Sequence, residues 1–269
     1  MIRPEDISFA GHRALVTGGA RGIGRATCEA LASLGADVAV CDRLTDELDD
    51  TVAVLRGLGS DVIAEVMDVR DAGAVEALVD SIGGRWGSLD ILVNNAGGGF
   101  VADTLEVSPN GRAALMSENF TQVLDVTARC VPLMRGGGAI VNITSIEAHR
   151  AGPGFGIYSA MKAGVENLTR TLALELADQR IRVNAVAPDM IPTPGDAELA
   201  ADAGAMAESD QWALTPWPDE GSPDDVAGAV VWLCSGWSRF VTGTTVHVDG
   251  GTSAASGWRR RTDGGNWLL

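Results

Sequence analysis

The sequence of 269 residues contains few of the features that are typical of disulfide-bonded, metal-binding or membrane-spanning proteins. It has four cysteines, three histidines and no apolar run that approaches the ~18 residues needed to cross a bilayer. The cysteines (Cys28, Cys41, Cys130 and Cys234) form no C-x-x-C pair, and none has a histidine at metal-ligand spacing. They therefore predict neither a disulfide framework nor a metal site, and we interpret them as small buried apolar side chains.

Positive charge is also scarce. The chain carries 36 Asp and Glu against 20 Lys and Arg, a formal charge of -16. Nucleic acids and anionic membranes bind clustered positive charge, so the balance favours a small-molecule partner over either. The opening residues MIRPEDISFAGHR carry acids where a signal peptide needs an apolar core, so we expect a cytoplasmic protein.

Seven short, mostly β-branched runs alternate with helix-like stretches. Their hydrophobicity is nearly continuous, which is typical of parallel strands covered on both faces. The pattern predicts an α/β fold, a Rossmann-type doubly wound seven-stranded parallel sheet with helices on both faces, in a single domain. The predicted strands are Arg13–Thr17, Asp37–Cys41, Asp61–Met67, Asp90–Asn94, Gly138–Thr144, Ile181–Ala187 and Thr244–Val248.

Capping residues and prolines between the runs indicate helix starts and two irregular segments. Ser108-Pro109 and Ser222-Pro223 each place a capping hydroxyl before a proline. We expect one nucleotide-binding unit over residues 1–251, a substrate lid at about 189–221, which holds four of the ten prolines, and a C-terminal tail over 252–269. The tail's tryptophans and arginines fit either a disordered end or an anchor against a neighbouring subunit.

A glycine-rich turn follows the first predicted strand. The segment TGGARGIG places Gly18, Gly22 and Gly24 where a tight turn leads into a helix, and the free N–H groups of such a helix can bind a pyrophosphate. Asp42 ends the second strand, where a carboxylate accepts the ribose hydroxyls of NAD and repels the extra phosphate of NADP. We therefore expect NAD, while Arg21 and Arg43 leave NADP open.

Acids near strand ends also have structural interpretations. Asp42 fits a capping or turn aspartate as well as a ribose acceptor. Asp68, after the third strand, either binds the adenine amino group or caps the helix near Asp71.

The single Tyr and the single Lys of the chain stand four residues apart, at Tyr158 and Lys162. Codon bias in a GC-rich genome explains their scarcity but not their spacing. On a helix this spacing puts both side chains on one face. A free phenol has a pKa of ~10 and is a poor base at neutral pH. An ammonium near the phenol oxygen stabilises the phenolate and lowers this pKa, so the tyrosine becomes suited to proton transfer. The alternative is a core tyrosine beside a lysine that extends to solvent.

With these residues the sequence resembles the short-chain dehydrogenase/reductase (SDR) family, classical type. The resemblance covers nearly the whole chain and includes TGGARGIG, NNAG, Asn119, Ser145, YSAMK and the late VDGG, in that order. It implies that Tyr158 exchanges the substrate proton, that Ser145 binds the substrate oxygen, that Lys162 also binds the nicotinamide ribose, and that Asn119 supports a proton-relaying water.

The resemblance also implies the cofactor contacts and one departure. Pro188 is followed by Asp189 where many members have glycine, which puts the backbone here in question, although Thr193 remains where the family contacts the nicotinamide carboxamide. NNAG is interpreted as mainly structural packing beside the adenosine half. The expected cofactor contacts are Gly18, Arg21, Gly22, Ile23, Gly24, Asp42, Arg43, Asp68, Val69, Asn95, Ala96, Gly97, Tyr158, Lys162, Pro188, Ile191 and Thr193.

Substrate contacts are expected before Tyr158 and in the lid. Apolar lid residues favour a bulky hydrophobic alcohol or ketone, such as a steroid or terpenoid, or only pack the lid onto the body. The expected substrate contacts are Ser145, Glu147, His149, Phe155, Met190, Trp212 and Trp217, of which His149 also fits an ordinary loop histidine. No metal is expected.

Three functions remain to be distinguished. The first is an NAD-dependent dehydrogenase of a secondary alcohol, the second a 3-oxoacyl-thioester reductase, and the third a nucleotide-sensing module without turnover. Asp42 and the acidic charge disfavour the second, and intact Ser145, Tyr158 and Lys162 disfavour the third. The resemblance implies a homotetramer.

Overall fold

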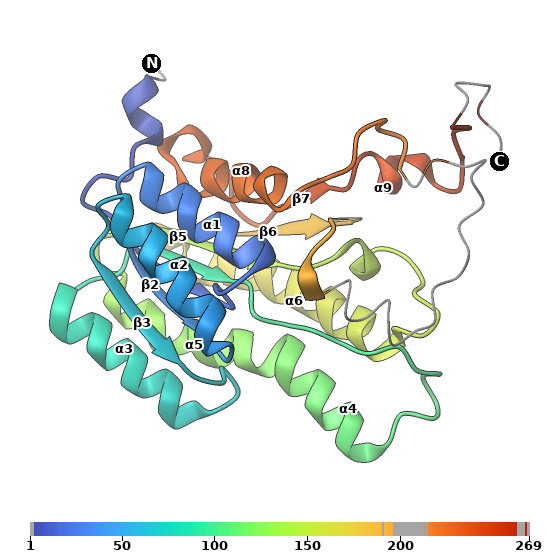
Figure 1. The fold of residues 1–269 in the computed structure, drawn as a ribbon, viewed down its shortest axis with the longest axis horizontal. Coiled ribbons are helices and arrows are strands. Elements are labelled where there is room, and N and C mark those ends of the chain that lie inside the picture. Colours follow the sequence, from blue (N-terminus) through green and yellow to red (C-terminus); the bar gives the residue numbers. More distant parts are fainter. Residues whose placement is uncertain (1–2, 190, 196–212, 214, 263–266, 268–269) are drawn as a thin grey trace.

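A seven-stranded sheet forms the centre of the computed structural model, which describes residues 3–189, 191–195, 213, 215–262 and 267 (Figure 1). All its strands are parallel, in the order β3-β2-β1-β4-β5-β6-β7. The strands are β1 (Arg13–Thr17), β2 (Asp37–Asp42), β3 (Val62–Val66), β4 (Ile91–Asn94), β5 (Gly138–Ile143), β6 (Ile181–Pro188) and β7 (Thr245–Val248). The predicted doubly wound fold is confirmed, and the strand ends differ from the expected ones by a residue at most.

Helices cover both faces of the sheet. The long ones are α1 (Gly22–Ser33), α2 (Thr45–Gly57), α3 (Ala72–Trp86), α4 (Pro109–Met116), α5 (Gln122–Cys130), α6 (Gly156–Glu175) and α8 (Pro223–Cys234). Short turns are η1 (Pro4–Ile7), the π-helical η2 (Ser117–Thr121), η3 (Val131–Leu133), η4 (Ile146–Ala148), η5 (Ala177–Gln179), η6 (Gly236–Ser238) and α9 (Thr252–Ala255).

Two apolar cores lie on opposite sides of the sheet. One contains Leu31 of α1, Leu55 of α2 and Val230 of α8, all fully buried. The other contains Leu78 of α3 and Val126 of α5. Because the inner strands β1, β2, β4, β5 and β6 are covered on both faces, they show no alternation of polar and apolar residues, which is why they were recognisable as continuous apolar runs. The edge strands β3 and β7 are partly exposed.

The predicted helix starts are present. Ser108 accepts a hydrogen bond from the backbone N–H of Gly111 at 3.1 Å, with Pro109 as the first residue of α4. Ser222 and Asp225 form a capping box at the start of α8. Each cap satisfies N–H groups that have no partner within the helix.

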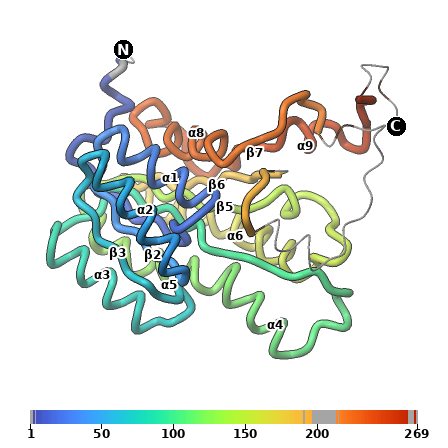
Figure 2. Tube along the Cα trace, in the orientation of Figure 1, coloured from blue at the N-terminus to red at the C-terminus, as the bar shows by residue number. Residues whose placement is uncertain are grey.

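The strand order reverses direction around β1, which lies between β2 and β4. The connections from β1 and from β4 therefore leave on opposite faces, and a crevice opens at the carboxyl ends of the strands. The trace passes from β7 into α9 on the side where the strands end (Figure 2). The carboxyl edge of the sheet is thus where a site can form.

The cysteines are free thiols, and Cys28, Cys41 and Cys130 are fully buried while Cys234 is partly so. Burial raises the pKa of the Cys41 and Cys130 thiols to about 12, so they stay protonated and unreactive at neutral pH. Within the described residues, no helix is long and apolar enough to cross a membrane.

Candidate active site

A cavity of about 1300 Å³ occupies the carboxyl edge of the sheet. Its wall contains every residue that was expected to contact the cofactor, from Gly18 to Thr193. Ser145, Glu147, Phe155 and Trp217 from the expected substrate contacts also line it. Met190 and Trp212 lie outside the described residues, and His149 lines a separate cavity.

The glycine-rich turn is shaped by close backbone contact. A Cβ on Gly24 would collide with the carbonyl oxygen of Gly18 and with Asn95 Nδ2. Gly22 has a φ of +56°, and a Cβ there would meet the side chain of Thr193 at 3.3 Å. Glycine at these positions therefore lets the turn approach both the fourth strand and the segment that holds Thr193.

The start of α1 suits a phosphate group. Arg21 is its N-cap residue, and no side-chain capping hydrogen bond is made there within the described residues. The N–H groups of Gly22, Ile23 and Gly24 belong to the first turn, where an α-helix supplies no acceptor of its own. A dinucleotide pyrophosphate matches both these donors and the open, glycine-lined wall in front of them.

The NNAG segment is tied to the glycine turn. Asn95 Nδ2 donates to the carbonyl oxygens of Thr17 and Gly18, at 3.0 and 2.8 Å. Thr17 Oγ1 accepts the backbone N–H groups of Asn95 and Ala96, both at 3.1 Å. These contacts give NNAG a structural role, as its sequence predicted.

Asp42 lines the cavity with both carboxylate oxygens already hydrogen-bonded. One oxygen accepts the N–H of Ala20 at 3.0 Å, and the other accepts those of Arg43 and Leu44 at 2.7 and 3.2 Å. The turn interpretation of Asp42 is therefore correct. It does not exclude ribose binding, because each carboxylate oxygen can accept a further hydrogen bond.

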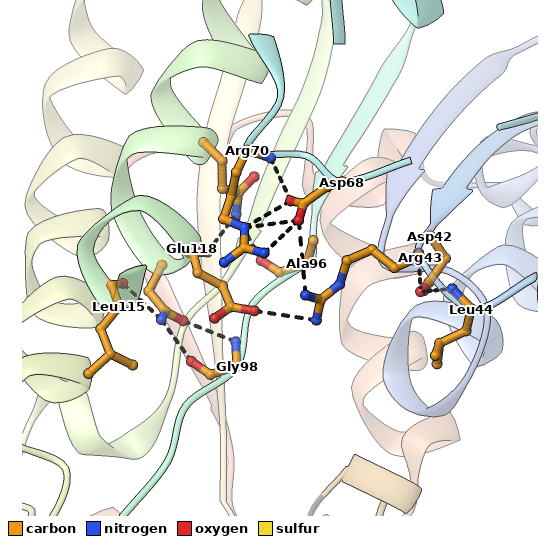
Figure 3. Close-up of polar contacts among 11 residues, drawn as sticks. Asp42, Arg43, Leu44, Asp68, Arg70, Ala96, Gly98, Leu115 and Glu118 are labelled. Atoms are coloured by element: carbon orange, nitrogen blue, oxygen red, sulfur yellow. Dashed lines mark hydrogen bonds and ion pairs between the residues drawn. The ribbon is translucent and has the colours of Figure 1, made fainter. Parts of the chain in front are cut away.

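A cluster of four charged side chains lies beside Asp42 (Figure 3). Asp68 accepts hydrogen bonds from the guanidinium of Arg70 at 2.5 to 3.1 Å, and these bonds hold the pKa of the Asp68 carboxyl below its ordinary value. Arg43 extends between Asp68 and Glu118, at 4.0 and 3.7 Å from their oxygens. Asp71 caps α3, so the capping alternative for Asp68 is wrong.

Ser145, Tyr158 and Lys162 all line the cavity. Tyr158 and Lys162 both lie on α6, and Lys162 Nζ is 5.6 Å from the centre of the Tyr158 ring. Lys162 is only 5% exposed and donates to the carbonyl oxygen of Ile143 at 3.0 Å. Burial lowers its pKa to about 8, and the carboxylate of Glu118 opposes that shift.

Ser145 lies between β5 and η4 and lines the cavity. Its Oγ accepts the N–H of Glu147 at 3.2 Å, which leaves the hydroxyl proton for a substrate oxygen. Phe155 packs edge-on against Tyr158, with 6.2 Å between ring centres.

Asn119 is fully buried in the π-helical turn η2. Its Nδ2 donates to the carbonyl oxygens of Gly98 and Leu115 at 2.7 and 3.0 Å, and its Oδ1 accepts the N–H of Gly98 at 3.3 Å. Asn119 Oδ1 and Lys162 Nζ both approach Gly97, at 3.0 and 3.2 Å from a Cβ built there. Asn119 thus fixes the strand end beside Lys162, and its role with a water stays a prediction.

A buried carboxylate supports the segment that carries Ser145. Glu166, one turn beyond Lys162 on α6, accepts a hydrogen bond from Thr144 Oγ1 at 3.2 Å and pairs with His149 Nε2 at 2.6 Å. Thr144 and His149 flank Ser145 in the chain, so a single side chain holds both sides of that residue. Glu166 was not predicted as a site residue, although its spacing of four residues from Lys162 places it on the same helix face.

Glu147, Arg150 and Asp189 form a polar part of the cavity wall. Arg150 donates to Glu147 at 2.9 Å and pairs with Asp189 at 3.3 Å. Asp189 has no positive φ, so the position needs no glycine, and its carboxylate instead ties the end of β6 to the segment after Ser145. The doubt raised by Asp189 about the local backbone is thereby removed.

Several lining residues were not predicted. They come from loops far apart in sequence and carry no motif of their own. They include Gly98, Gly99, Phe100, Glu118, Asp219, Glu220, Arg260 and Thr262. Among the described residues, no group of three or more His, Cys, Asp or Glu side chains has the arrangement of a metal site.

Comparisons with known proteins identify relatives of this chain. The family model described as enoyl-(acyl carrier protein) reductase matches residues 18–253. The chain is 37% identical over 262 residues to 3beta-hydroxysteroid dehydrogenase 1 of Eggerthella lenta, covering 93% of this chain and 96% of that protein. It is also 37% identical over 239 residues to the 3-oxoacyl-(acyl-carrier-protein) reductase of Thermotoga maritima, covering 88% of this chain and 96% of the other.

A solved structure shares the whole architecture. It is a 7 alpha-hydroxysteroid dehydrogenase complexed with NADH and 7-oxo glycochenodeoxycholic acid, with a TM-score of 0.85, 30% identity, and coverage of 93% of this chain and 98% of that one. Fold, motif order and relatives lead to one assignment. The chain belongs to the classical short-chain dehydrogenase/reductase family of oxidoreductases.

Proposed function

We propose that the protein is an NAD-dependent dehydrogenase that interconverts a secondary alcohol and a ketone on a hydrophobic small molecule. The observation that carries the proposal is that Ser145, Tyr158 and Lys162 line the same cavity as the glycine turn and Asp42. The steroid-oxidising relative and the steroid-bound structural neighbour support the substrate class by similarity.

Ser145, Tyr158 and Lys162 form a catalytic triad in this proposal, and each has one role. Ser145 donates a hydrogen bond from its hydroxyl to the substrate oxygen and stabilises the charge that develops there. Tyr158 takes the proton of the alcohol hydroxyl in oxidation and returns it in reduction. NAD, when bound, supplies the hydride acceptor.

Lys162 keeps a positive charge beside Tyr158. Its pKa of about 8 leaves it mostly protonated at neutral pH, and its hydrogen bond to Ile143 fixes the ammonium on the cavity wall. A cation near the tyrosine oxygen favours the deprotonated form that accepts the substrate proton. Asn119 maintains the backbone opposite Lys162 and, in this proposal, holds a water that connects it to solvent.

NAD is preferred over NADP because of Asp42. Its carboxylate is fixed by three backbone N–H groups at the end of β2, where it can accept ribose hydroxyls. An added phosphate would meet this fixed negative charge. Asp68 and Glu118 add further negative charge on the same side, offset in part by Arg43 and Arg70.

A 3-oxoacyl-thioester reductase is the second candidate, favoured by the 37% identity to the Thermotoga maritima enzyme. The acidic net charge of -16 disfavours docking of an acidic carrier protein. A nucleotide sensor without turnover is disfavoured by the intact triad. For the assembly we propose a homotetramer, which light scattering of the purified protein would test.

The direct test is an NADH-absorbance screen of the purified protein against alcohols of four classes: steroids, terpenoids, sugars and acyl thioesters. We expect NADH to form with NAD and a steroid or terpenoid secondary alcohol, and more slowly with NADP. Turnover confined to acyl thioesters with the NADP(H) couple would replace the proposal with the second candidate. Tight NADH binding without turnover of any alcohol or ketone would favour the sensor.

A further inference from the structure

A second cavity of about 600 Å³ adjoins the first. It lies between the segment after Ser145 and the C-terminal residues that contain α9. Ile146, Arg150, Ala213 and Arg260 line both cavities. The two cavities are therefore adjacent, and a molecule that spans both would place its reacting carbon beside Ser145 and Tyr158 and its far end in the second cavity.

The charge of this second cavity is opposite to that of the chain. Its described lining carries Arg150, Arg259, Arg260 and His149 and contains no Asp or Glu, in a protein of net charge -16. Arg150 is already paired with Glu147 and Asp189. The charge that remains for a ligand comes from Arg259 and Arg260.

Neither of these two arginines has a salt bridge to a described residue. The Nε of Arg260 is buried and has no hydrogen-bond partner within the described structure. The backbone of the same residue is held in place, because its carbonyl oxygen accepts the N–H of Ala213 at 3.0 Å. A buried guanidinium donor without an acceptor is costly, and an anionic ligand group would supply the acceptor.

The rest of the lining is mostly small or apolar. Ile146, Pro216 and Trp258 provide apolar surface, while Thr252 and Ser253 provide hydroxyls. A guanidinium presents parallel N–H donors that match a planar carboxylate. The cavity therefore suits an apolar molecule that ends in a carboxylate.

We propose that the substrate is an alcohol or ketone with an apolar body and a carboxylate remote from the reacting carbon, and that Arg259 and Arg260 bind this carboxylate in the second cavity. The inference rests on the proposed function for the reacting end of the molecule. The carboxylate site itself is defined by the second cavity and can be measured without turnover.

The test is calorimetric titration with two oxo or hydroxy acids, cholate and 4-oxocyclohexanecarboxylate, each compared with its uncharged primary amide. Cholate, a hydroxy acid, is titrated with saturating NADH and 4-oxocyclohexanecarboxylate, an oxo acid, with saturating NAD, so that no hydride can be transferred; both titrations are repeated without cofactor. The variants are the double substitution R259Q/R260Q and, as a control with the same change in net charge, R56Q/R170Q at exposed positions on α2 and α6. Circular dichroism and thermal midpoints check that each variant is folded.

We expect at least one acid to bind the wild-type protein tenfold or more tightly than its amide, a preference lost in R259Q/R260Q and kept in R56Q/R170Q. Three results would each overturn the proposal: no acid binding better than its amide, a preference that survives in R259Q/R260Q, or inorganic phosphate binding more tightly than both acids. Because these titrations need no hydride transfer, they can succeed where the alcohol screen fails, and fail where it succeeds.

Discussion

The ammonium of Lys162 donates a hydrogen bond to the carbonyl oxygen of Ile143 at 3.0 Å and so joins α6 to the carboxyl end of β5. Ile143 lies two residues before Ser145, so the bond fixes two members of the triad relative to each other. Glu166 makes the next connection between the same two elements through Thr144. The relative positions of Ser145, Tyr158 and Lys162 thus depend on buried polar contacts that one face of α6 makes with the end of β5.

Burial of Lys162 predicts a specific pH dependence of stability. Its pKa is lowered from an ordinary 10.5 to about 8 in the folded protein. Between these pH values the unfolded chain binds a proton that the folded chain does not, so the free energy of unfolding rises with pH by up to about 3 kcal/mol. Lys162→Met lacks this contribution.

Urea unfolding of the wild-type protein and of Lys162→Met, at intervals from pH 7 to pH 10, measures the contribution of Lys162 to the free energy of unfolding. The wild-type protein should gain stability relative to Lys162→Met as pH rises through this window. Parallel curves for the two proteins would show that Lys162 is not desolvated in the folded state.

Asp42→Ala should relax the preference for NAD. Loss of the fixed carboxylate removes a repulsion from the extra phosphate of NADP and leaves Arg43 to attract it. The ratio of NADH to NADPH affinity, measured by fluorescence titration, should fall by about tenfold, which corresponds to about 1.4 kcal/mol.

Asp50→Ala is the matched control, since it removes an exposed carboxylate from α2. The double variant D42A/R43A should bind NADPH more weakly than Asp42→Ala does. An unchanged ratio in Asp42→Ala would assign that residue a structural role alone.

Glu166 should position Ser145 without touching the substrate. Glu166→Ala removes the acceptor of Thr144 and the partner of His149, so we expect the free energy of unfolding to fall by about 1–3 kcal/mol and kcat to fall with it. KM and NADH affinity should change little. Glu166→Gln keeps an acceptor for Thr144 and should recover most of kcat.

Recovery of kcat in Glu166→Gln would separate the positioning of Ser145 from a general effect on stability. Equal kcat values for wild-type protein and Glu166→Ala, measured well below the thermal midpoint of the variant, would show that the carboxylate contributes only to the stability of the fold.

Much of the fold could be predicted because its signals are local. Continuous β-branched runs marked strands such as β1 and β5, and Ser222-Pro223 marked the start of α8. The spacing of Tyr158 and Lys162 placed both on one helix face, where the structure has them.

The remaining features depend on contacts between distant parts of the chain. No local pattern shows that Arg43 reaches Glu118 or that Arg260 lines the cavity of Ser145. The position of His149 was also not predictable, because its partner Glu166 comes from another element. Such contacts arise from tertiary packing, which the spacing of residues in one segment does not encode.

Tyr158→Phe tests the central claim most directly, because it removes one hydroxyl and leaves the ring that packs against Phe155. NADH affinity and turnover of the best alcohol from the screen are measured on the same preparations of wild-type and variant protein. The account predicts nearly unchanged NADH affinity together with a loss of turnover of about 10²-fold or more. Turnover by Tyr158→Phe at a rate close to that of the wild-type protein would contradict the assignment of proton transfer to this residue.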